Sequence, residues 1–200
     1  VEDFQLRTRL SKGSRRTLAK IGALNGLAAH RRDAMWKVEM SREPDDLFGR
    51  LSEAGVCASP LKAMDRGERV QADYQGTGLT TGRHPMALIR PYLDGIWRAM
   101  DLDQAPNGRL VRIAGAVICR QRPGTAKGFV FISLEDETGV ANAILTPQFF
   151  EDHRLVVTEE AFLIIQGVLQ KQKGVIHIKA RQVEALRTGD LPSLASHDFH

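Results

Sequence analysis

The second half of the chain shows a regular alternation of apolar and polar positions. Val111 and Ile113 flank Arg112, and this period of two is typical of a half-buried β-strand. Residues 136–139, Asp-Glu-Thr-Gly, predict a hairpin turn between two such runs. The whole pattern predicts five strands, over residues 111–119, 128–134, 140–145, 161–170 and 175–183.

A short helix is expected between the third and fourth strands. Pro147 suits the first turn of a helix that ends near Asp152. Three strands, a helix and a two-stranded hairpin follow one another in the OB-fold, a five-stranded barrel that often binds oligonucleotides. An SH3-like or other small barrel is the structural alternative.

The first forty residues follow a helical period instead. Leu18 and Ile21 are three positions apart, and Ser14 can cap the helix that carries them. Asn-Gly at 25–26 interrupts this helix, and a second one is expected over 29–40. Two helices joined by a tight turn are typical of a hairpin that meets DNA phosphates, although a hairpin with solvated arginines fits the same pattern.

The middle of the chain is rich in turn formers, and a third helix is expected from Pro85 to about Met100. The predicted fold class is therefore α+β, with helices followed by a five-stranded OB-fold barrel. We expect a helical hairpin at 1–43, a connector with a helix at 44–107, the barrel at 108–187 and a tail at 188–200.

The second predicted strand carries the main candidate for nucleic-acid binding. Alternation places Val130, Ile132 and Leu134 in the core, which leaves Phe129 and Phe131 on the outer face. Exposed rings stack on bases while nearby cations meet phosphates. Alternation in the first strand places Arg112 and Arg120 on the same outer face as these rings. The competing interpretation reverses the two faces. The candidate nucleic-acid-binding residues are Phe129, Phe131, Arg112, Arg120, Arg122 and Lys127 on the barrel, and Arg15, Arg16, Arg31 and Arg32 on the helical hairpin.

The charge distribution supports an anionic partner. The net charge is only +4, but residues 1–43 hold 10 Lys and Arg against 5 Asp and Glu. Residues 109–127 add five basic side chains and no acidic one. Two local basic patches on a nearly balanced chain favour nucleic acid as the partner.

Other candidate chemistry is weak. Glu135, Asp136 and Glu137 could hold a metal, but their place in a tight turn favours a solvated hairpin. Residues 196–200, Ser-His-Asp-Phe-His, are expected to form a frayed tail. Two cysteines without a CxxC motif indicate reduced thiols. We find no phosphate-binding loop, no nucleophile–base pair and no catalytic carboxylate set, so no catalytic residue, resident metal or cofactor is expected.

Several segments resemble the bacterial family C DNA polymerases. Residues 78–88, GLTTGRHPMAL, are similar to the segment that precedes the OB-fold in that family. Residues 117–139, VICRQRPGTAKGFVFISLEDETG, closely resemble its error-prone branch, as does the ending at 196–200. Residues 15–36 are similar to the helix-hairpin-helix region before it. The resemblance covers nearly the whole chain.

The resemblance implies the C-terminal part of a larger DNA-directed polymerase. Such polymerases act in damage-induced translesion synthesis in the cytoplasm, and their catalytic carboxylates and Mg²⁺ belong to an upstream palm domain that nothing here matches. The implied partners are single-stranded template DNA and accessory translesion proteins, with no membrane. The family contacts the sliding clamp through a Gln-x-x-Leu-Phe-like peptide. Residues 44–48, Pro-Asp-Asp-Leu-Phe, stand in that place, but proline replaces the glutamine, which argues against clamp binding.

Three functional hypotheses remain at this point. The first is a non-catalytic DNA-binding part of an error-prone polymerase. The second is an anticodon-type RNA-binding OB-fold, which also uses an aromatic residue on its second strand. The third is a docking module for accessory polymerase factors. The helical hairpin favours the first over the second, and nothing in the sequence separates the first from the third.

Overall fold

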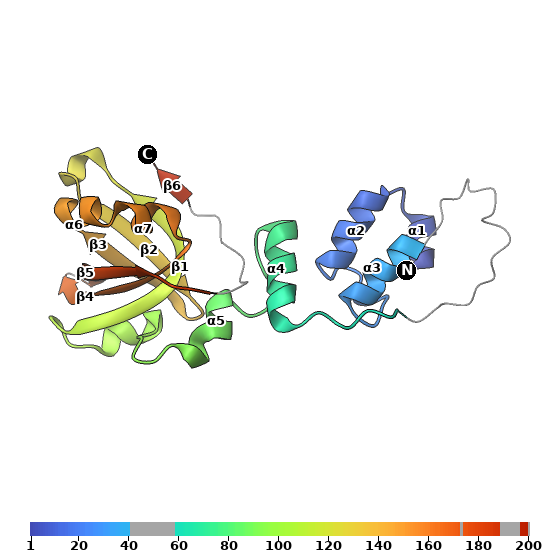
Figure 1. Cartoon of the computed structure of the whole chain (residues 1–200), viewed down its shortest axis with the longest axis horizontal. Helices are drawn as coiled ribbons and strands as arrows, with labels where there is room; N and C mark the ends of the chain where they lie inside the picture. Colours follow the sequence, from blue (N-terminus) through green and yellow to red (C-terminus); the bar gives the residue numbers. More distant parts are fainter. Residues whose placement is uncertain (41–58, 173, 189–196, 200) are drawn as a thin grey trace. The chain divides into compact units, whose positions relative to one another are not determined.

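A computed structural model describes residues 1–40, 59–172, 174–188 and 197–199; of the last range only the backbone is described. The chain divides into two compact units, Val1–Thr81 and Gly82–His200. The first unit is helical and the second contains the β-barrel (Figure 1). The α+β class expected from the sequence is confirmed.

The first unit contains four helices: α1 (Glu2–Arg7), α2 (Lys12–Lys20), α3 (Arg31–Met40) and α4 (Arg66–Thr77). Ala19, Leu24, Ala34 and Val38 form the core that α2 and α3 share. The cap of α2 is Ser11 rather than Ser14, because the Ser11 hydroxyl accepts the Ser14 N–H at 3.1 Å. The hairpin of two helices is therefore present, with boundaries shifted by a few residues from those expected.

Helix α4 lies inside the stretch that we expected to be a connector. The Asp65 side chain accepts the Glu68 N–H and Glu68 accepts the Asp65 N–H, which makes a complete capping box. Gly78 ends the helix in the left-handed conformation, with φ of 74°. The described part of this stretch belongs to both units, since α4 lies in the first and residues 82–107 in the second.

The second unit is a closed five-stranded barrel, and it confirms the predicted OB-fold order. Its strands are β1 (Leu110–Gln121), β2 (Val130–Asp136), β3 (Gly139–Leu145), β4 (Phe162–Gln172) and β5 (Val175–Ala185). They lie in the order β2-β3-β5-β4-β1, and pairing of β1 with β2 closes the barrel. Helices α6 (Pro147–Asp152) and α7 (Arg154–Glu159) join β3 to β4, and Phe150 and Val157 of these helices pack into the barrel core.

The prediction of one helix over residues 85–100 is wrong beyond its first turns. Helix α5 (Pro85–Ile89) is followed by a 3-10 turn, η1 (Arg90–Tyr92), and later by a second one, η2 (Ala99–Gln104). Pro91 has no N–H to donate to the carbonyl four residues earlier, and Gly95 has a φ of +67°, so the α-helix does not continue to residue 100. Tertiary packing instead buries Met86 against β1 and β4 and places Leu102 in the barrel core.

Strand β1 pairs along both of its edges. On one edge it pairs with β4 up to Ala116 and then with the short parallel strand β6 (His197–Phe199). On the other edge a bridge from Trp97 to Ile113 precedes the pairing with β2. The prediction of a frayed tail is therefore wrong for residues 197–199. These residues pair through their backbone with Cys119–Gln121.

Candidate nucleic-acid interface

The outer surface of β2 and β3 carries the main candidate site. Phe131 is 36% exposed, whereas Ile132 on the other side of the strand is fully buried. Phe131 lies in register with Ile144, and Ser133 lies in register with Asn142. The Ser133 hydroxyl donates to Asn142 Oδ1 at 2.9 Å, so the pair next to Phe131 and Ile144 is polar. We call Phe131, Ser133, Asn142 and Ile144 the β2–β3 face. The outward position of Phe131 agrees with the face assignment made from the sequence.

Lys127 and Phe129 lie in the loop that leads into β2. Lys127 is exposed and has a φ of 49°, the left-handed conformation that ends the short η3 turn (Gly124–Ala126). Phe129 is half-buried and lies just before the strand, and its N–H donates to the Ala126 carbonyl at 3.0 Å. The loop therefore presents a lysine near the start of β2, while Phe129 is less accessible than Phe131.

Arg120 does not lie on the face that the sequence predicted. The register between β1 and β2 shifts between Val117 and Cys119, which indicates a β-bulge at Ile118. A bulge adds one residue and reverses which side chains face outward beyond it. Arg120 consequently pairs with Ile132 of β2, a core-facing position, and its guanidinium donates to the Val157 and Glu160 carbonyls at 2.7 and 2.6 Å. The prediction that it shares a face with Phe131 is wrong.

Arg112 and Arg122 form ion pairs on the barrel surface. Arg112 donates to Glu184 at 2.9 Å, and Arg122 donates to Glu151 at 3.3 Å. The Arg122 guanidinium also lies over the Phe150 ring, 5.2 Å from the ring centre. Each would have to exchange a carboxylate for a phosphate before it could contact nucleic acid.

The four arginines of the helical hairpin also have internal partners. Arg16 forms a two-pronged ion pair with Glu39, and this hydrogen bonding lowers the pKa of Glu39 to about 2. Arg32 donates to Glu68 at 2.7 Å. Arg31 is 9% exposed and donates to Asp73 at 2.6 Å, which ties α3 to α4. Arg15 is likewise 9% exposed. Arg15 and Arg31 are therefore not surface cations, contrary to the expectation, because both lie in the interior of the unit.

The acidic turn between β2 and β3 has a structural role that the sequence did not reveal. Asp136 is buried and accepts the N–H groups of Thr138, Gly139 and Ala99. Arg90 donates to Asp136 at 3.2 Å and to Glu137 at 2.6 Å. These bonds fasten the segment before the barrel to the hairpin. Among the described residues, no cluster of three or more His, Cys, Asp or Glu side chains is arranged to hold a metal ion.

His84 caps α5 beside the same turn. Its Nδ1 accepts the Met86 N–H at 3.1 Å, which leaves the proton of the neutral ring on Nε2. Nε2 lies 3.7 Å from the Glu135 carboxylate. Burial lowers the pKa of His84, although the three carboxylates Glu135, Glu137 and Asp136 oppose that shift. The acidic end of the β2–β3 hairpin is thus covered by the preceding segment, whereas the opposite end carries Lys127.

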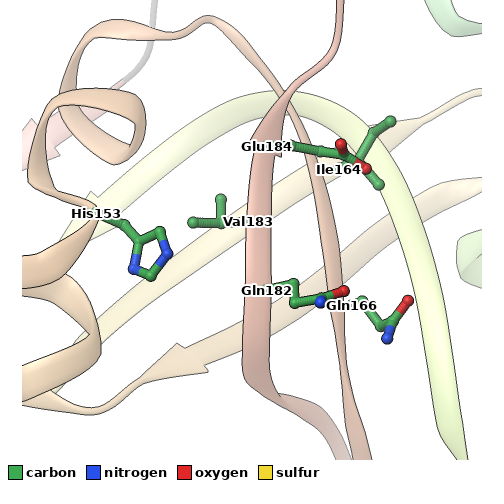
Figure 2. Close-up of a pocket in the computed structure, with 6 residues that line it drawn as sticks. All are labelled: His153, Ile164, Gln166, Gln182, Val183 and Glu184. Atoms are coloured by element: carbon green, nitrogen blue, oxygen red, sulfur yellow. The ribbon is translucent and has the colours of Figure 1, made fainter.

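A polar pocket of about 290 Å³ lies elsewhere on the barrel, beside β4 and β5. In Figure 2, Val183 points from β5 toward His153, while Gln182 and Gln166 point the other way. The ring of His153 stacks on Phe149 with 4.2 Å between the ring centres. None of the residues that line this pocket belongs to β2 or β3, so it is separate from the β2–β3 face. The lining residues are His153, Ile164, Gln166, Gln182, Val183 and Glu184.

Known proteins resemble this chain at two levels: the barrel alone and the chain over its full length. The model of an OB-fold nucleic acid binding domain matches residues 111–186. An error-prone DNA polymerase from Anaeromyxobacter sp. (strain K) is 39% identical over 203 residues, covering 100% of this chain and 18% of the relative. An error-prone DNA polymerase from Bordetella parapertussis is also 39% identical, over 99% of this chain and 20% of its own length. The chain thus spans about a fifth of the length of these relatives.

One similar solved structure covers part of the chain. The crystal structure of asparaginyl-tRNA synthetase from Pyrococcus horikoshii matches 40% of this chain and 20% of its own, with 22% identity and a TM-score of 0.34. No helix in the described ranges is long and apolar enough to cross a membrane. The full-length sequence similarity and the barrel together show that the chain is homologous to the C-terminal segment of error-prone DNA polymerases and contains an OB-fold nucleic-acid-binding domain.

Proposed function

We propose that this chain binds single-stranded template DNA for an error-prone polymerase through the β2–β3 face. The exposed ring of Phe131 is the observation that carries the proposal. A phenylalanine that is 36% exposed on an otherwise regular barrel strand loses apolar burial, and stacking on a base compensates for that loss. Ile144 beside it extends the apolar surface, and the Ser133–Asn142 pair supplies polar groups that can reach base edges.

The charge along the barrel supports one location for the DNA on this face. Glu135 and Glu137 lie at the β2–β3 hairpin, where Arg90 and His84 contact them. Lys127 lies at the opposite end, where β2 begins. A polyanion is repelled from the acidic end and attracted to the basic one. The proposed path therefore crosses the part of the face near Phe131.

The polymerase context is the second part of the proposal. The relatives are named error-prone DNA polymerases, and this chain corresponds to about a fifth of their length. We infer that the parent protein copies damaged template in the cytoplasm during damage-induced translesion synthesis, and that accessory translesion proteins assist it. The clamp-like segment at 44–48 lies outside the described residues.

The helical hairpin contributes a second candidate contact with DNA. Helices α2 and α3 retain the hairpin arrangement, and Gly22 adopts a φ of +87° in the turn between them. Arg16 and Arg32 are the two predicted arginines that reach the surface, each in an ion pair. In this proposal a DNA phosphate replaces Glu39 or Glu68 as the partner of an arginine, as in a helix-hairpin-helix contact.

Oligonucleotide binding by the full chain tests the proposal. Phe131→Ala should weaken binding of a fluorescent single-stranded DNA by about 1–3 kcal/mol in an anisotropy titration at fixed salt. Tyr92→Ala is the matched control, because Tyr92 is an exposed aromatic in η1 and not part of the β2–β3 face. Circular dichroism establishes that both variants are folded.

Two outcomes would overturn this function. Equal affinity of Phe131→Ala and the unsubstituted chain would remove Phe131 from the site. Tighter binding of an RNA oligonucleotide than of DNA with the same sequence would favour the anticodon-type interpretation, since the 2′-hydroxyl is the group that distinguishes them.

A further inference from the structure

Lys179 of β5 lies in the same row of the barrel surface as Phe131. Phe131 is in register with Ile144 across the β2–β3 pair, and Ile144 is in register with Lys179 across the parallel β3–β5 pair. Side chains of paired residues project from the same side of a sheet. The row therefore continues from an aromatic ring, over an aliphatic side chain, to a cation.

The Lys179 ammonium is directed to solvent. Its neighbours Ile178 and Ala180 are buried in the barrel, so alternation places Lys179 on the outside, and its side chain is exposed. In the described part of the chain, no hydrogen bond or ion pair engages this ammonium group. It can meet a phosphate without giving up an existing partner.

Most cations predicted to contact phosphates are engaged elsewhere. Arg112 and Arg122 are paired with carboxylates, and Arg120 donates to two backbone carbonyls. Of the four cations predicted on the barrel, Lys127 is the one with no hydrogen-bond or ion-pair partner among the described residues. Lys127 and Lys179 thus lie on different sides of Phe131, one before the start of β2 and the other two strands away.

The backbone around Lys179 is held by close packing. Gly167 of β4 pairs with Ala180, the next residue along β5, and a Cβ at position 167 would overlap the Lys179 carbonyl oxygen. The register shifts between Gln166 and Gly167, so that Arg181 forms a bulge in β5 beside this contact. Glycine at 167 therefore allows β4 to approach β5 closely, and this contact constrains the backbone position from which Lys179 projects.

We propose that Lys179 binds a backbone phosphate of the strand whose base stacks on Phe131, an inference that rests on the proposed function. Neighbouring strands lie about 4.8 Å apart, so Phe131 and Lys179 are separated by about 10 Å across the sheet. A single strand that crosses β2, β3 and β5 can place a base over the ring and a phosphate near the ammonium. Because phosphates are common to all sequences, Lys179 contributes affinity without sequence preference.

The test compares Lys179→Gln with Lys171→Gln in the full chain. Both remove one lysine charge, but Lys171 already donates to the Asp103 carbonyl and lies on β4. Losing one phosphate contact should flatten the log–log salt dependence of single-stranded DNA binding by about 0.7. We expect that change for Lys179→Gln with both oligo-dT and oligo-dA, no change for Lys171→Gln, and a slope close to that of the unsubstituted chain for Lys179→Arg.

The outcomes separate this inference from the function on which it rests. If Phe131→Ala weakens binding while a folded Lys179→Gln leaves the salt slope unchanged, the phosphate role of Lys179 is wrong and the proposed function stands. If the unsubstituted chain does not bind single-stranded DNA at all, the proposed function itself fails. Equal flattening by Lys171→Gln would show a general charge effect and would also overturn the inference.

Discussion

At the scale of single residues, His84 couples the fold of the second unit to pH. The neutral ring caps α5 through Nδ1, and protonation would remove that acceptor. Burial lowers the pKa of His84 in the folded chain, whereas the unfolded chain takes up the proton near pH 6.5. Below about pH 6.5 the unfolded state therefore binds more protons, and the free energy of unfolding falls.

This linkage predicts a loss of thermal stability on acidification. Between pH 7.5 and 5.5, the Tm of the unsubstituted chain should fall further than that of His84→Asn, which keeps a capping acceptor but cannot be protonated. Differential scanning calorimetry at the two pH values measures the difference. Parallel decreases in both proteins would show that His84 is not the group responsible.

Asp136 is the side chain whose loss should be most costly among the acids of the hairpin turn. It is buried, and three backbone N–H groups and Arg90 donate to it. Asp136→Ala should lower the free energy of unfolding by about 3 kcal/mol, because it leaves these donors without their acceptor. Asp101→Ala, which breaks an exposed pair with Arg98, should cost less than about 1 kcal/mol in the same urea titration. Equal costs would contradict the structural role of the turn.

At the scale of elements, close strand approach sets a strict requirement at Gly167. Gly167→Ala should destabilise the second unit by about 1–3 kcal/mol, because the new methyl group overlaps the backbone carbonyl of Lys179. Gly124→Ala is the control, since nothing lies within 4 Å of a Cβ placed there. Urea unfolding of the two variants checks the prediction, and a neutral Gly167→Ala would mean that β4 can move away from β5 at little cost.

Strand β6 gives a second prediction at this scale. Deleting residues 197–200 should expose the backbone of Cys119–Gln121 on the edge of β1 that β6 now pairs with. Hydrogen exchange should accelerate for amides in this segment, while exchange in β4 and β5 stays unchanged. Unaltered protection of 119–121 would show that β6 contributes little to that edge.

At the scale of the whole molecule, the two units should fold independently. A fragment of residues 82–200 should keep the thermal transition of the barrel, because its main core and the cluster around Met86 lie within it. A fragment of residues 108–200 should be far less stable, since it lacks Leu102 and Ala105 of the core and the Arg90 contact with Asp136. Calorimetry of the two fragments tests this, and equal stability would show that the segment before the barrel is dispensable.

The sequence by itself determined the local features of this protein. Alternation in β2 placed Ile132 inside and Phe131 outside, and a sequence-local capping box at Asp65 and Glu68 could have revealed α4. These features depend on side-chain period and on neighbours within four residues, which can be read along the chain. The order of strands and helix was sufficient for the same reason to predict an OB-fold barrel.

Only the tertiary structure decided which charged groups remain available. Arg31 is buried against Asp73 in α4, and Arg112 meets Glu184, 72 positions away. The bulge at Ile118 turned Arg120 away from Phe131, and the β3–β5 pairing brought Lys179 into its row. Each of these depends on a partner distant in sequence or on a one-residue shift in register, and a period counted along a single strand contains neither.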